Sequence, residues 1–266
     1  MKLILASSQD PAAQNISERL LELYDFERYP EQPNAYIGEK ESVAMLKVEG
    51  GVTRISAPPF DVAEVIVASR HASEAGRQSL TVHVPGELEK RDLALASPST
   101  VKSALNALVK ARDELGLAHD VSLEATHHGP TTLNVPVTFV EIGSKLEQWQ
   151  DRKAGEAAAS AIMEAARETS GSLSAVGVGG PHYAPRHTEA ALKTNIGIGH
   201  IIPKYIRFTE ELLEDAVRRT SGGAEILLAD WKGMSAEQRS VCRAAAEKLK
   251  IKLERAGDAT PGRFSR

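Results

Sequence analysis

"LSAVGVGGPHYAPRHTEAALKTNIGIGHIIPKYIRFTEELLEDAVRRTSGGAEILLADWKGMSAEQRSVCRAAAEKLK", residues 173–250, alternates short apolar runs with amphipathic ones. These runs predict strand, helix, strand, helix, strand and helix, in that order, at 173–180, 188–194, 197–202, 209–220, 224–230 and 235–250. Strands that alternate with helices need crossover connections, which favour a largely parallel sheet covered on both faces. The stretch therefore predicts an α/β fold.

The N-terminal part adds further strands to the expected sheet. KLILAS at 2–7 is typical of a buried strand, and Asp10 with Pro11 predicts a helix start, because Asp suits an N-cap and Pro the first helical position. The β-rich runs AMLKV, TRIS, EVIVAS and LTVHV follow, separated by Gly and Pro. No linker divides residues 1–266, so we expect a single domain with a mixed, mostly parallel sheet flanked by helices. Residues 34–60 would form a β-rich excursion or an edge of that sheet.

Two further helices have sequence signals at their ends. Ser99 is the expected N-cap of a helix that Gly116 ends, since Gly favours the left-handed conformation that follows many helices. Ser144 and Glu147 are expected to form a capping box in front of a long alanine-rich helix.

The composition limits the class of protein. Of 266 residues, 42% are hydrophobic and 26% are charged, which is enough apolar surface for a folded core. The single cysteine, Cys242, excludes a disulfide framework and a cysteine-based zinc site, so any metal would need His, Asp or Glu ligands. The apolar run at the N-terminus is too short for a signal peptide and no later run approaches a membrane span. We expect a soluble cytoplasmic protein.

The net charge of −4 argues against a protein that coats DNA or other nucleic acid indiscriminately, because that mode needs a broad positive field. A local basic surface is compatible with it. Cationic side chains gather toward the C-terminus at Arg239, Arg243, Lys248, Lys250, Lys252, Arg255, Arg263 and Arg266. The alternative interpretation of these residues is a solvated helix face and tail.

A crowded stretch, LEATHHGPTTLNVPVTFVEIG at 123–143, places His127 and His128 between Glu124 and a Gly-Pro turn. An imidazole titrates near neutrality and binds zinc, so either histidine could be a general base, a proton carrier or a metal ligand. On a continuing strand the two side chains would point to opposite faces and could not both reach one point. We therefore expect one of them, rather than both, to take part in chemistry. The alternative is that each only forms a structural hydrogen bond.

Similar loops follow several predicted strands. His71 follows EVIVA, His83 lies in LTVHVPG, and GVGGPHYAPRH at 177–187 follows LSAVGV. Of the eight histidines, only His119 and, less clearly, His200 fall outside these loops. Ligands of α/β sheets bind beyond the carboxyl ends of the strands. We therefore expect one pocket there, lined by His71, Glu124, His127, His128, His182 and Tyr183.

The glycines of 177–187 could let a ligand approach the backbone, whose N–H groups suit a phosphate, a carboxylate or an oxyanion. The alternative is a tight strand-to-helix connection. The sequence contains no strand-nested G-x-S-x-G and no H-E-x-x-H, and Cys242 in an apolar helix is a poor nucleophile. Activated water is the simplest nucleophile for such a site.

EATHHGPT, FVEIGS and GVGGPHYAPRHT together resemble the archaeal and plant type of D-aminoacyl-tRNA deacylase, and SRHASEAGRQSLTVHVPGE is similar to an upstream segment of that family. The resemblance runs from the first strand to the last helix. It implies proofreading hydrolysis of the ester between a D-amino acid and the terminal ribose of tRNA. It also implies a Zn²⁺ requirement and a fold like that of phosphorylases and peptidyl-tRNA hydrolases.

An aminoacyl ester is already activated, so such an enzyme needs a positioned water, a base or metal to deprotonate it, and donors for the oxyanion. The catalytic candidates are His127, His128, His182, Glu124 and Thr131. The substrate-binding candidates are His71, Gly129, Gly179, Gly180, Tyr183 and Arg186. The candidate zinc ligands, not all of them needed, are His83, His127, His128, Glu141 and His182.

The acceptor end of tRNA is the expected partner, held through its phosphates by a basic surface near the pocket, and a monomer is favoured. Candidates for this surface, besides the C-terminal cations, are Arg152, Lys153, Arg186, Lys204 and Arg207. Two other functions stay open on the residues alone. One is a metal-dependent hydrolase or phosphorylase of a small peptide or nucleoside, and the other is a noncatalytic tRNA-binding protein.

Overall fold

The first strand and helix form where the sequence places them. The computed structural model of the chain describes residues 1–38, 40, 42–55, 61–169 and 171–264. Strand β1 (Lys2–Ser7) is buried, and helix α1 (Pro11–Leu23) follows it. The Oδ1 of Asp10 accepts hydrogen bonds from the N–H groups of Ala12 and Ala13, at 2.8 and 3.1 Å, which confirms Asp10 as the N-cap.

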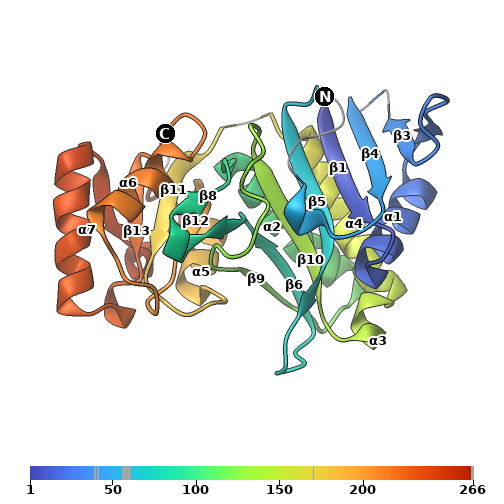
Figure 1. Ribbon diagram of the computed structural model, residues 1–266. Helices are drawn as coiled ribbons and strands as arrows, with labels where there is room; N and C mark the ends of the chain where they lie inside the picture. The colour runs from blue at the N-terminus through green and yellow to red at the C-terminus, as the bar shows by residue number, and fades with distance from the viewer. Residues whose placement is uncertain (39, 41, 56–60, 170, 265–266) are drawn as a thin grey trace.

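The larger of two sheets has eight strands in the order β2-β3-β4-β1-β5-β10-β6-β9 (Figure 1). Besides β1, its strands are β2 (Glu27–Arg28), β3 (Ala35–Gly38), β4 (Val43–Val48), β5 (Glu64–Ala72), β6 (Ser79–His83), β9 (Asp120–Leu123) and β10 (Val137–Ser144). The β4, β1, β5 and β10 strands are parallel, β6 runs antiparallel to β10, and β9 is parallel to β6. The mixed, mostly parallel sheet is confirmed.

The segment expected to be a β-rich excursion is part of this sheet. Strand β4 pairs in parallel with β1, and β3 pairs antiparallel with β4, so the segment forms the sheet's edge region. The predicted strand TRIS is wrong for its described residues, because Val52–Arg54 form a turn of 3-10 helix. Residues 56–60 lie outside the described residues.

Residues 173–255, which include the alternating stretch quoted first, form a second, all-parallel sheet in the order β12-β11-β13-β14. Its strands are β11 (Leu173–Val178), β12 (Ile196–Ile202), β13 (Ile226–Ala229) and β14 (Lys252–Arg255). The helices between them are α5 (Pro185–Lys193), α6 (Glu210–Arg218) and α7 (Ala236–Leu249). The predicted alternation of strand and helix is confirmed. A two-stranded ribbon, β7 (Gly86–Glu87) with β8 (Asp92–Leu93), lies outside both sheets.

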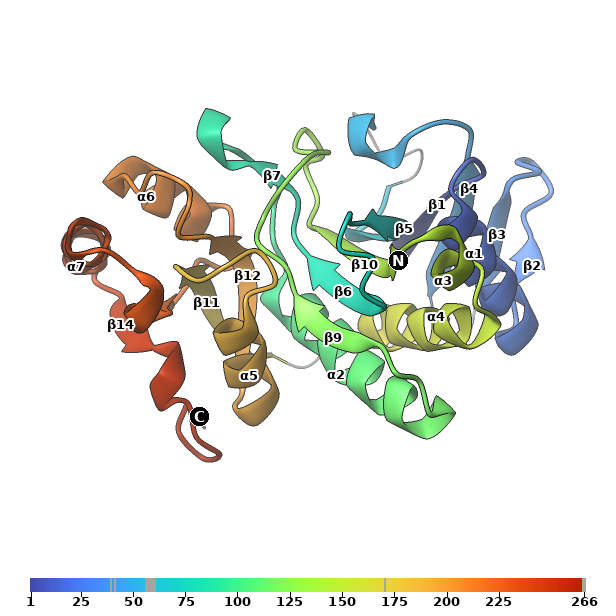
Figure 2. The ribbon, with the colours of Figure 1, turned by 90° about the horizontal axis from the view of Figure 1, so that it is seen from below.

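Helices α1, α2 (Pro98–Leu115) and α4 (Arg152–Arg167) lie on one face of the larger sheet, while loops and β7 lie over the other (Figure 2). The expectation of helices on both faces is therefore wrong for this sheet. The physical reason is that its second face carries the polar side chains of the candidate site. The expectation holds for the smaller sheet, since α6 and α7 pack on one face and α2 and α5 on the other.

Two predicted helix starts are wrong. Ser97, not Ser99, is the N-cap of α2, because Pro98 already takes a helical position. Ser144 and Glu147 form no capping box, because it is the side chain of Gln148 that accepts from the Ser144 N–H, at 2.6 Å. The helix that follows, α3 (Leu146–Trp149), is a single turn. Helix α4 then starts anew at its own N-cap, Asp151. The predicted end of α2 at Gly116 is confirmed, with φ of 65°.

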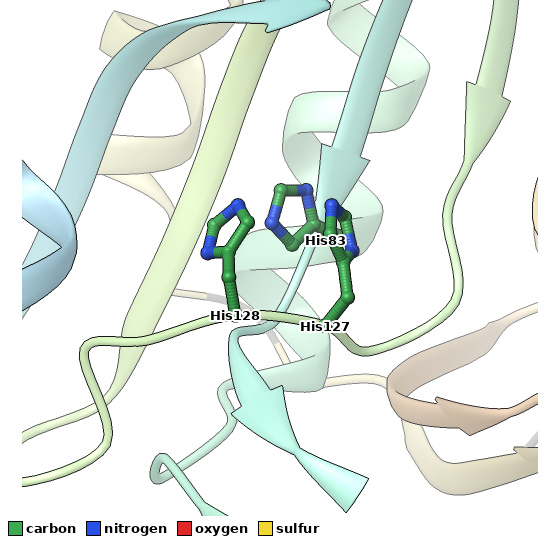
Figure 3. Close-up of side chains that lie close together, drawn as sticks. All are labelled: His83, His127 and His128. Atoms are coloured by element: carbon green, nitrogen blue, oxygen red, sulfur yellow. The ribbon is translucent and has the colours of Figure 1, made fainter. Parts of the chain in front are cut away.

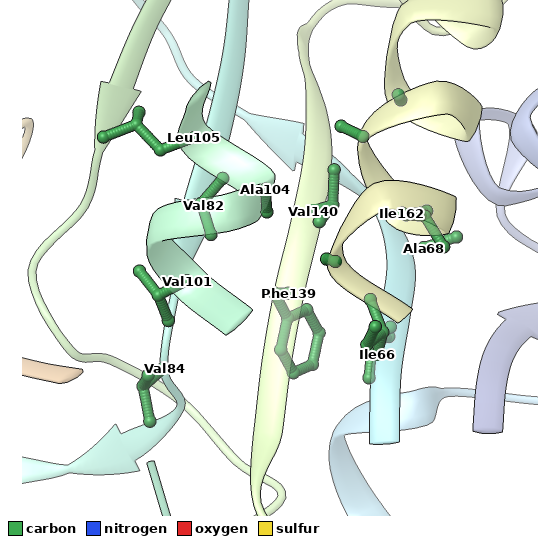
Figure 4. Packing of buried hydrophobic residues seen from close by; sticks show 14 of the residues in the cluster. Ile66, Ala68, Val82, Val84, Val101, Ala104, Leu105, Phe139, Val140 and Ile162 are labelled. Atoms are coloured by element: carbon green, nitrogen blue, oxygen red, sulfur yellow. The ribbon is translucent and has the colours of Figure 1, made fainter. Parts of the chain in front are cut away.

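One hydrophobic cluster extends through both sheets. Phe139 of β10 belongs to it, as do Val101 and Leu105 of α2 (Figure 4). Helix α2 carries the cluster onward to Ile196 and Ile198 of β12. Among the described helices, none combines the length and the hydropathy that a membrane span needs.

Candidate active site

Strands β5, β10 and β6 align polar side chains on the face of the larger sheet that lies opposite the helices. Glu141 of β10 is paired with Ser69 of β5 and Thr81 of β6, and Gly143 is paired in the same way with His71. Directly paired residues share a face of the sheet, so these groups form polar rows side by side. Each row is buried, which places ionisable groups in a region of low dielectric.

The loop after β9 joins this face to the smaller sheet. The N–H of Ala125 donates to the His182 carbonyl at 2.7 Å, and the N–H of Thr126 donates to the Ile201 carbonyl at 2.9 Å. These two bonds hold the loop that contains His127 against β12 and the loop after β11. The candidate site therefore lies where the two sheets meet.

His83, His127 and His128 point toward one another (Figure 3). The ring of His83 lies 4.3 Å from that of His127 and 4.9 Å from that of His128, and the rings of the two adjacent histidines are 4.4 Å apart. The expectation that only one of the adjacent pair could reach such a point is wrong. The chain is no longer a strand here, and His128 has a left-handed φ of 42°, which turns both rings to the same side.

Two backbone hydrogen bonds fix the tautomers of these histidines. The Nδ1 of His127 lies 2.8 Å from the Ala125 carbonyl, and the Nδ1 of His128 lies 2.7 Å from the Gly129 carbonyl. A carbonyl only accepts, so each Nδ1 carries the proton and each Nε2 keeps its lone pair. Within the described residues, neither ring nitrogen of the buried His83 has a hydrogen-bond partner.

The carboxylates of the site lie beneath the histidines. Glu124 is within 3.1 Å of Nδ1 of His71 and 3.7 Å of Nε2 of His182, and Glu141 is 3.7 Å from His71. On its other side, His71 shares a hydrogen bond of 2.9 Å with the Tyr183 hydroxyl. Both carboxylates are almost completely buried, at 1% and 2% exposure, so their charge is available only to groups within the site.

The same surroundings shift the pKa values of the two carboxyls in opposite directions. Burial raises the pKa of Glu141 to about 7, and the charge of Glu124 adds to this, while the hydrogen bond with His71 opposes it. Burial also opposes ionisation of Glu124. The hydrogen bond from His182 and the charges of His71 and His127 outweigh that effect, so the pKa of Glu124 is lowered. The site therefore holds one carboxylate that stays ionised and one that retains a proton more readily.

Burial lowers the pKa of His127 to about 4, and the neighbouring charge of His128 adds to this effect. Burial also lowers the pKa of His83 and of His128. Histidine binds a metal ion through an uncharged ring nitrogen, so these environments keep the rings in the form that a metal needs.

Three overlapping groups have ligand atoms within 4.8 Å of one another, the separation that a shared metal ion requires. They are His83 with His127 and His128, Glu124 with His127 and His182, and His71 with Glu124 and Glu141. The nitrogens of His83 and the oxygens of Glu124, which form no hydrogen bond of good geometry with a described residue, are buried in these groups. Buried polar atoms without a partner are costly, and a cation would satisfy them. The residues thus fit a zinc ion.

A cavity of about 580 Å³ opens on the histidines, and His71, His127, His128, His182 and Glu141 line part of it. A second cavity, of about 300 Å³, lies on the other side of His127 and His128 and is also lined by Tyr205. Of the six residues expected to line one pocket, His71, His127, His128 and His182 line the larger cavity. Glu124 is buried against His71 and His182, and Tyr183 is bonded to His71 but lines a separate cavity.

Other predicted site residues lie apart from this cluster. The hydroxyl of Thr131 donates to Asp92 at 2.6 Å, and Arg186 is exposed and paired with Glu189 at 3.0 Å. The Gly179 N–H donates to the Ile202 carbonyl at 2.8 Å, so it has no proton to offer an oxyanion. A Cβ on Gly180 would lie 3.0 Å from Asp230, which shows that this glycine packs against the turn after β13.

Two of the histidines are structural. His187 was expected in the pocket loops, but it lies on the buried face of α5 and its Nε2–H donates to the Leu228 carbonyl at 2.9 Å. His200, whose position was less clear, lies buried in β12 and shares hydrogen bonds with Thr126 and the Ala94 carbonyl. His119 lies apart from the cluster, as expected, and its ring nitrogens contact no described hydrogen-bond partner.

Sequence reasoning missed Asp10 and Gly143 as site residues. The Oδ2 of Asp10 accepts from the Arg70 N–H at 3.0 Å, so the N-cap of α1 also fixes the wall of the larger cavity next to His71. Gly143 lies against His71 and Ser79. A helix cap and a strand glycine have no chemical signal of their own, and only the parallel pairing of β1, β5 and β10 brings them to the site.

Comparison with known proteins agrees with this geometry. The sequence profile of a family described as D-aminoacyl-tRNA deacylase matches residues 59–254. A D-aminoacyl-tRNA deacylase of Thermococcus kodakarensis is 35% identical, with 96% of this chain and 100% of the relative aligned. One of Methanosarcina mazei is 36% identical over 94% of this chain and 90% of the relative. A crystal structure of a protein described as conserved and of unknown function is 33% identical, with a TM-score of 0.89 over 97% of this chain and 96% of that one.

Proposed function

The chain belongs to the family of D-aminoacyl-tRNA deacylases, and from this premise we propose how its residues hydrolyse the ester between a D-amino acid and tRNA. The products are a free D-amino acid and tRNA, so the reaction removes a wrongly acylated tRNA. The observation that carries the proposal is the convergence of His83, His127, His128 and His182 with two buried carboxylates beside one cavity. The residues alone also allowed a small-molecule hydrolase and a noncatalytic tRNA-binding protein, and family membership favours the deacylase.

We propose that His83, His127 and His128 hold the zinc ion. Their ring nitrogens can converge on one point, the Nδ1 protons of His127 and His128 leave each Nε2 with its lone pair, and His83 forms no hydrogen bond with a described residue. Three protein ligands with one open position are typical of catalytic zinc. When bound, the ion would lower the pKa of a water and polarise the ester carbonyl.

The nucleophile is a water rather than a side chain. Two serines line the cavity, but Ser7 donates to the Gly50 carbonyl at 2.7 Å and Ser69 lies 3.5 Å from Asp10. In this proposal Glu124, ionised and in contact with His71 and His182, accepts the proton of the attacking water. As the carbon–oxygen bond breaks, the ribose oxygen takes a proton and leaves as a hydroxyl. No described backbone carbonyl accepts a hydrogen bond from the Gly129 N–H, so this group is the candidate donor to the oxyanion.

The test replaces His127, His128 and His182 by alanine one at a time, with His119→Ala as the matched control. His119 is buried but lies outside the cluster. Single-turnover deacylation of D-tyrosyl-tRNA and bound zinc are measured on each folded variant. Loss of a metal ligand, or of the histidine beside the general base Glu124, should slow the reaction on the order of a hundredfold or more.

Zinc content separates the proposed metal ligands from His182, which contacts the proposed general base Glu124. Replacing His127 or His128 should remove zinc and activity together, whereas His182→Ala should lower the rate and retain zinc. His119→Ala should keep both. Near-normal rates in all three cluster variants would take histidine out of the chemistry.

Three of the cations proposed for the tRNA-binding surface already have partners within the protein. Arg152 is paired with Glu22, the Nζ of Lys153 donates to the Leu115 carbonyl, and Arg186 is paired with Glu189. Lys204 is connected to the candidate active site, because its N–H donates to the carbonyl of Gly180, two residues before His182. Lys204 and Arg207, together with the exposed C-terminal arginines Arg243 and Arg255, are the better candidates for contacts with phosphates.

We also retain three proposals that follow from the substrate. The enzyme acts in the cytoplasm, where aminoacyl-tRNA is made, it acts on tRNA rather than DNA, and it works as a monomer. Light scattering of the purified protein tests the last of these: a mass near twice that of one chain would contradict it.

A further inference from the structure

The indole ring of Trp231 lies among three guanidinium groups at one end of the smaller sheet. Arg239 and Arg243 come from consecutive turns of α7, and Arg255 ends β14. Their Cζ atoms lie 5.3, 5.1 and 5.0 Å from the centre of the ring. Arg239 also donates from Nε and Nη2 to the Trp231 carbonyl, at 3.1 and 2.7 Å, which holds the turn Trp231–Gly233 against the helix. We call these four residues the Trp231 cluster.

The charges of the Trp231 cluster are not neutralised by the protein. Among the described residues, no carboxylate forms an ion pair with Arg239, Arg243 or Arg255, whereas Arg263 nearby is paired with Glu254 at 2.8 Å. A cation–π contact at an exposed site is weak, and like charges around one ring repel one another. Arg243 and Arg255 are exposed. An anion that bridges the guanidinium groups would relieve this repulsion.

The cluster is connected to the candidate active site through short contacts. Asp230, which precedes Trp231, packs against Gly180 in the loop that carries His182. The side chain of Gln238 in α7 donates to the Lys204 carbonyl at 2.8 Å, and the Lys204 N–H donates to the Gly180 carbonyl at 2.9 Å. In Figure 1, α7 and β13 form the side of the molecule next to β11. A strand of nucleic acid that leaves the His182 loop toward α7 would meet the cluster.

We propose that the Trp231 cluster binds backbone phosphates of the tRNA substrate next to its acylated end. Guanidinium groups recognise phosphate through paired hydrogen bonds, and the ring holds them at fixed positions, so little side-chain entropy is lost on binding. Arg239 is fixed by the backbone, and Arg243 and Arg255 make the contacts to phosphate. This inference rests on the proposed function, because it takes the substrate to be an aminoacyl-tRNA.

The experiment compares Arg243→Gln, Arg255→Gln and the double variant with Lys252→Gln, which removes an exposed cation of the same strand β14 outside the cluster. Affinity for uncharged tRNA is measured by fluorescence anisotropy over a range of salt. Each arginine variant should bind about threefold to tenfold more weakly at low salt, with the slope of log affinity against log salt reduced by about one. Lys252→Gln should match the unmodified protein in slope.

Deacylation provides the second measurement. The arginine variants should slow deacylation of D-tyrosyl-tRNA at subsaturating enzyme, and should match the unmodified protein when enzyme is saturating. They should also hydrolyse D-tyrosyl-adenosine at the normal rate, because that substrate has no phosphate backbone.

The outcomes separate the two proposals. If the unmodified protein does not deacylate D-tyrosyl-tRNA, the proposed function is wrong, and the affinity measurement alone then decides on the cluster. If the unmodified protein is active and the double variant binds tRNA like Lys252→Gln, the cluster is not a phosphate site. A loss of D-tyrosyl-adenosine hydrolysis in the arginine variants would also overturn the inference, because the cluster would then act through the shape of the active site.

Discussion

Gly143 shows how a single residue without a side chain can position a reactive one. A Cβ at this position would lie 2.8 Å from Cδ2 of His71 and would also contact the Ser79 hydroxyl. Real side chains do not approach so closely, and both neighbours are buried strand residues with little room to move. His71 can reach Glu124 and Tyr183 only because β10 has a glycine beside it.

Gly143→Ala should therefore displace His71 and slow deacylation by at least about tenfold, since a misplacement of the order of 1 Å is costly in catalysis. Gly257→Ala is the control, because a Cβ at Gly257 meets no described atom within 4 Å. Both variants are measured by single-turnover deacylation of D-tyrosyl-tRNA and by thermal unfolding. A Gly143→Ala enzyme with the control's rate would show that the position of His71 does not matter to the reaction.

At the same scale, the sequence predicted which residue types gather but not how they touch. His71, Glu124, His127, His128 and His182 were expected together because each follows a predicted strand, and the structure places them together. The adjacent histidines were misjudged because the left-handed φ of His128 is not visible in residue types. The partner of Thr131 could not be predicted either, since Asp92 lies 39 residues away and reaches it only in the folded chain.

At the scale of elements, β12 carries a buried titratable group between the two sheets. His200 is 0% exposed, its Nε2–H donates to the Ala94 carbonyl at 3.0 Å, and the Thr126 hydroxyl lies 3.2 Å from its Nδ1. Burial lowers the pKa of His200 to about 4, with the charge of Arg219 acting in the same direction. The folded state thus holds the neutral ring. In the unfolded chain the pKa of the same ring is near 6.5, so it takes up a proton as the pH falls below that value.

A pKa that is lower in the folded state gives stability that is present above the unfolded value and is lost as pH falls. We expect the free energy of unfolding to drop by about 2 kcal/mol between about pH 7 and pH 5 from His200 alone. His200→Gln should lack this part of the drop while it retains the part due to other histidines. Urea unfolding of both proteins at each pH measures the difference. Equal drops would mean that His200 titrates normally in the folded protein.

Elements were predicted best where local signals agree with their tertiary setting. The Asp10 cap of α1 and the Gly116 end of α2 were found because each depends on one residue and its nearest neighbours. The break between α3 and α4 was missed because the N-cap is Lys145 rather than Ser144, and its N–H donates to the side chain of Gln148, one residue beyond the expected Glu147. The division of strands into two sheets depends on pairing between distant segments, so an alternating pattern alone cannot indicate it.

At the scale of the whole molecule, two sheets share one hydrophobic cluster. Ile66 and Phe139 of the larger sheet and Ile196 and Leu228 of the smaller one belong to it. Helix α2 packs against α4 on one side and against β12 on the other. Unfolding either sheet alone would expose the apolar surface of its partner, at a cost of roughly 25 cal/mol per Å². The prediction of a single domain therefore becomes a prediction of a single unfolding transition.

The two tryptophans can test this, because one lies beside each sheet. Trp149 donates from its ring N–H to the His71 carbonyl at 3.0 Å, next to the larger sheet, and Trp231 follows β13 in the smaller one. In Trp231→Phe only Trp149 fluoresces, and in Trp149→Phe only Trp231 does. Because a substitution can itself shift stability, each variant's fluorescence transition in urea is compared with its own circular dichroism transition. We expect the two to coincide in both variants. If Trp231 fluorescence changed at a lower urea concentration than the circular dichroism of the same variant, the smaller sheet would unfold independently, and the chain would contain two domains rather than one.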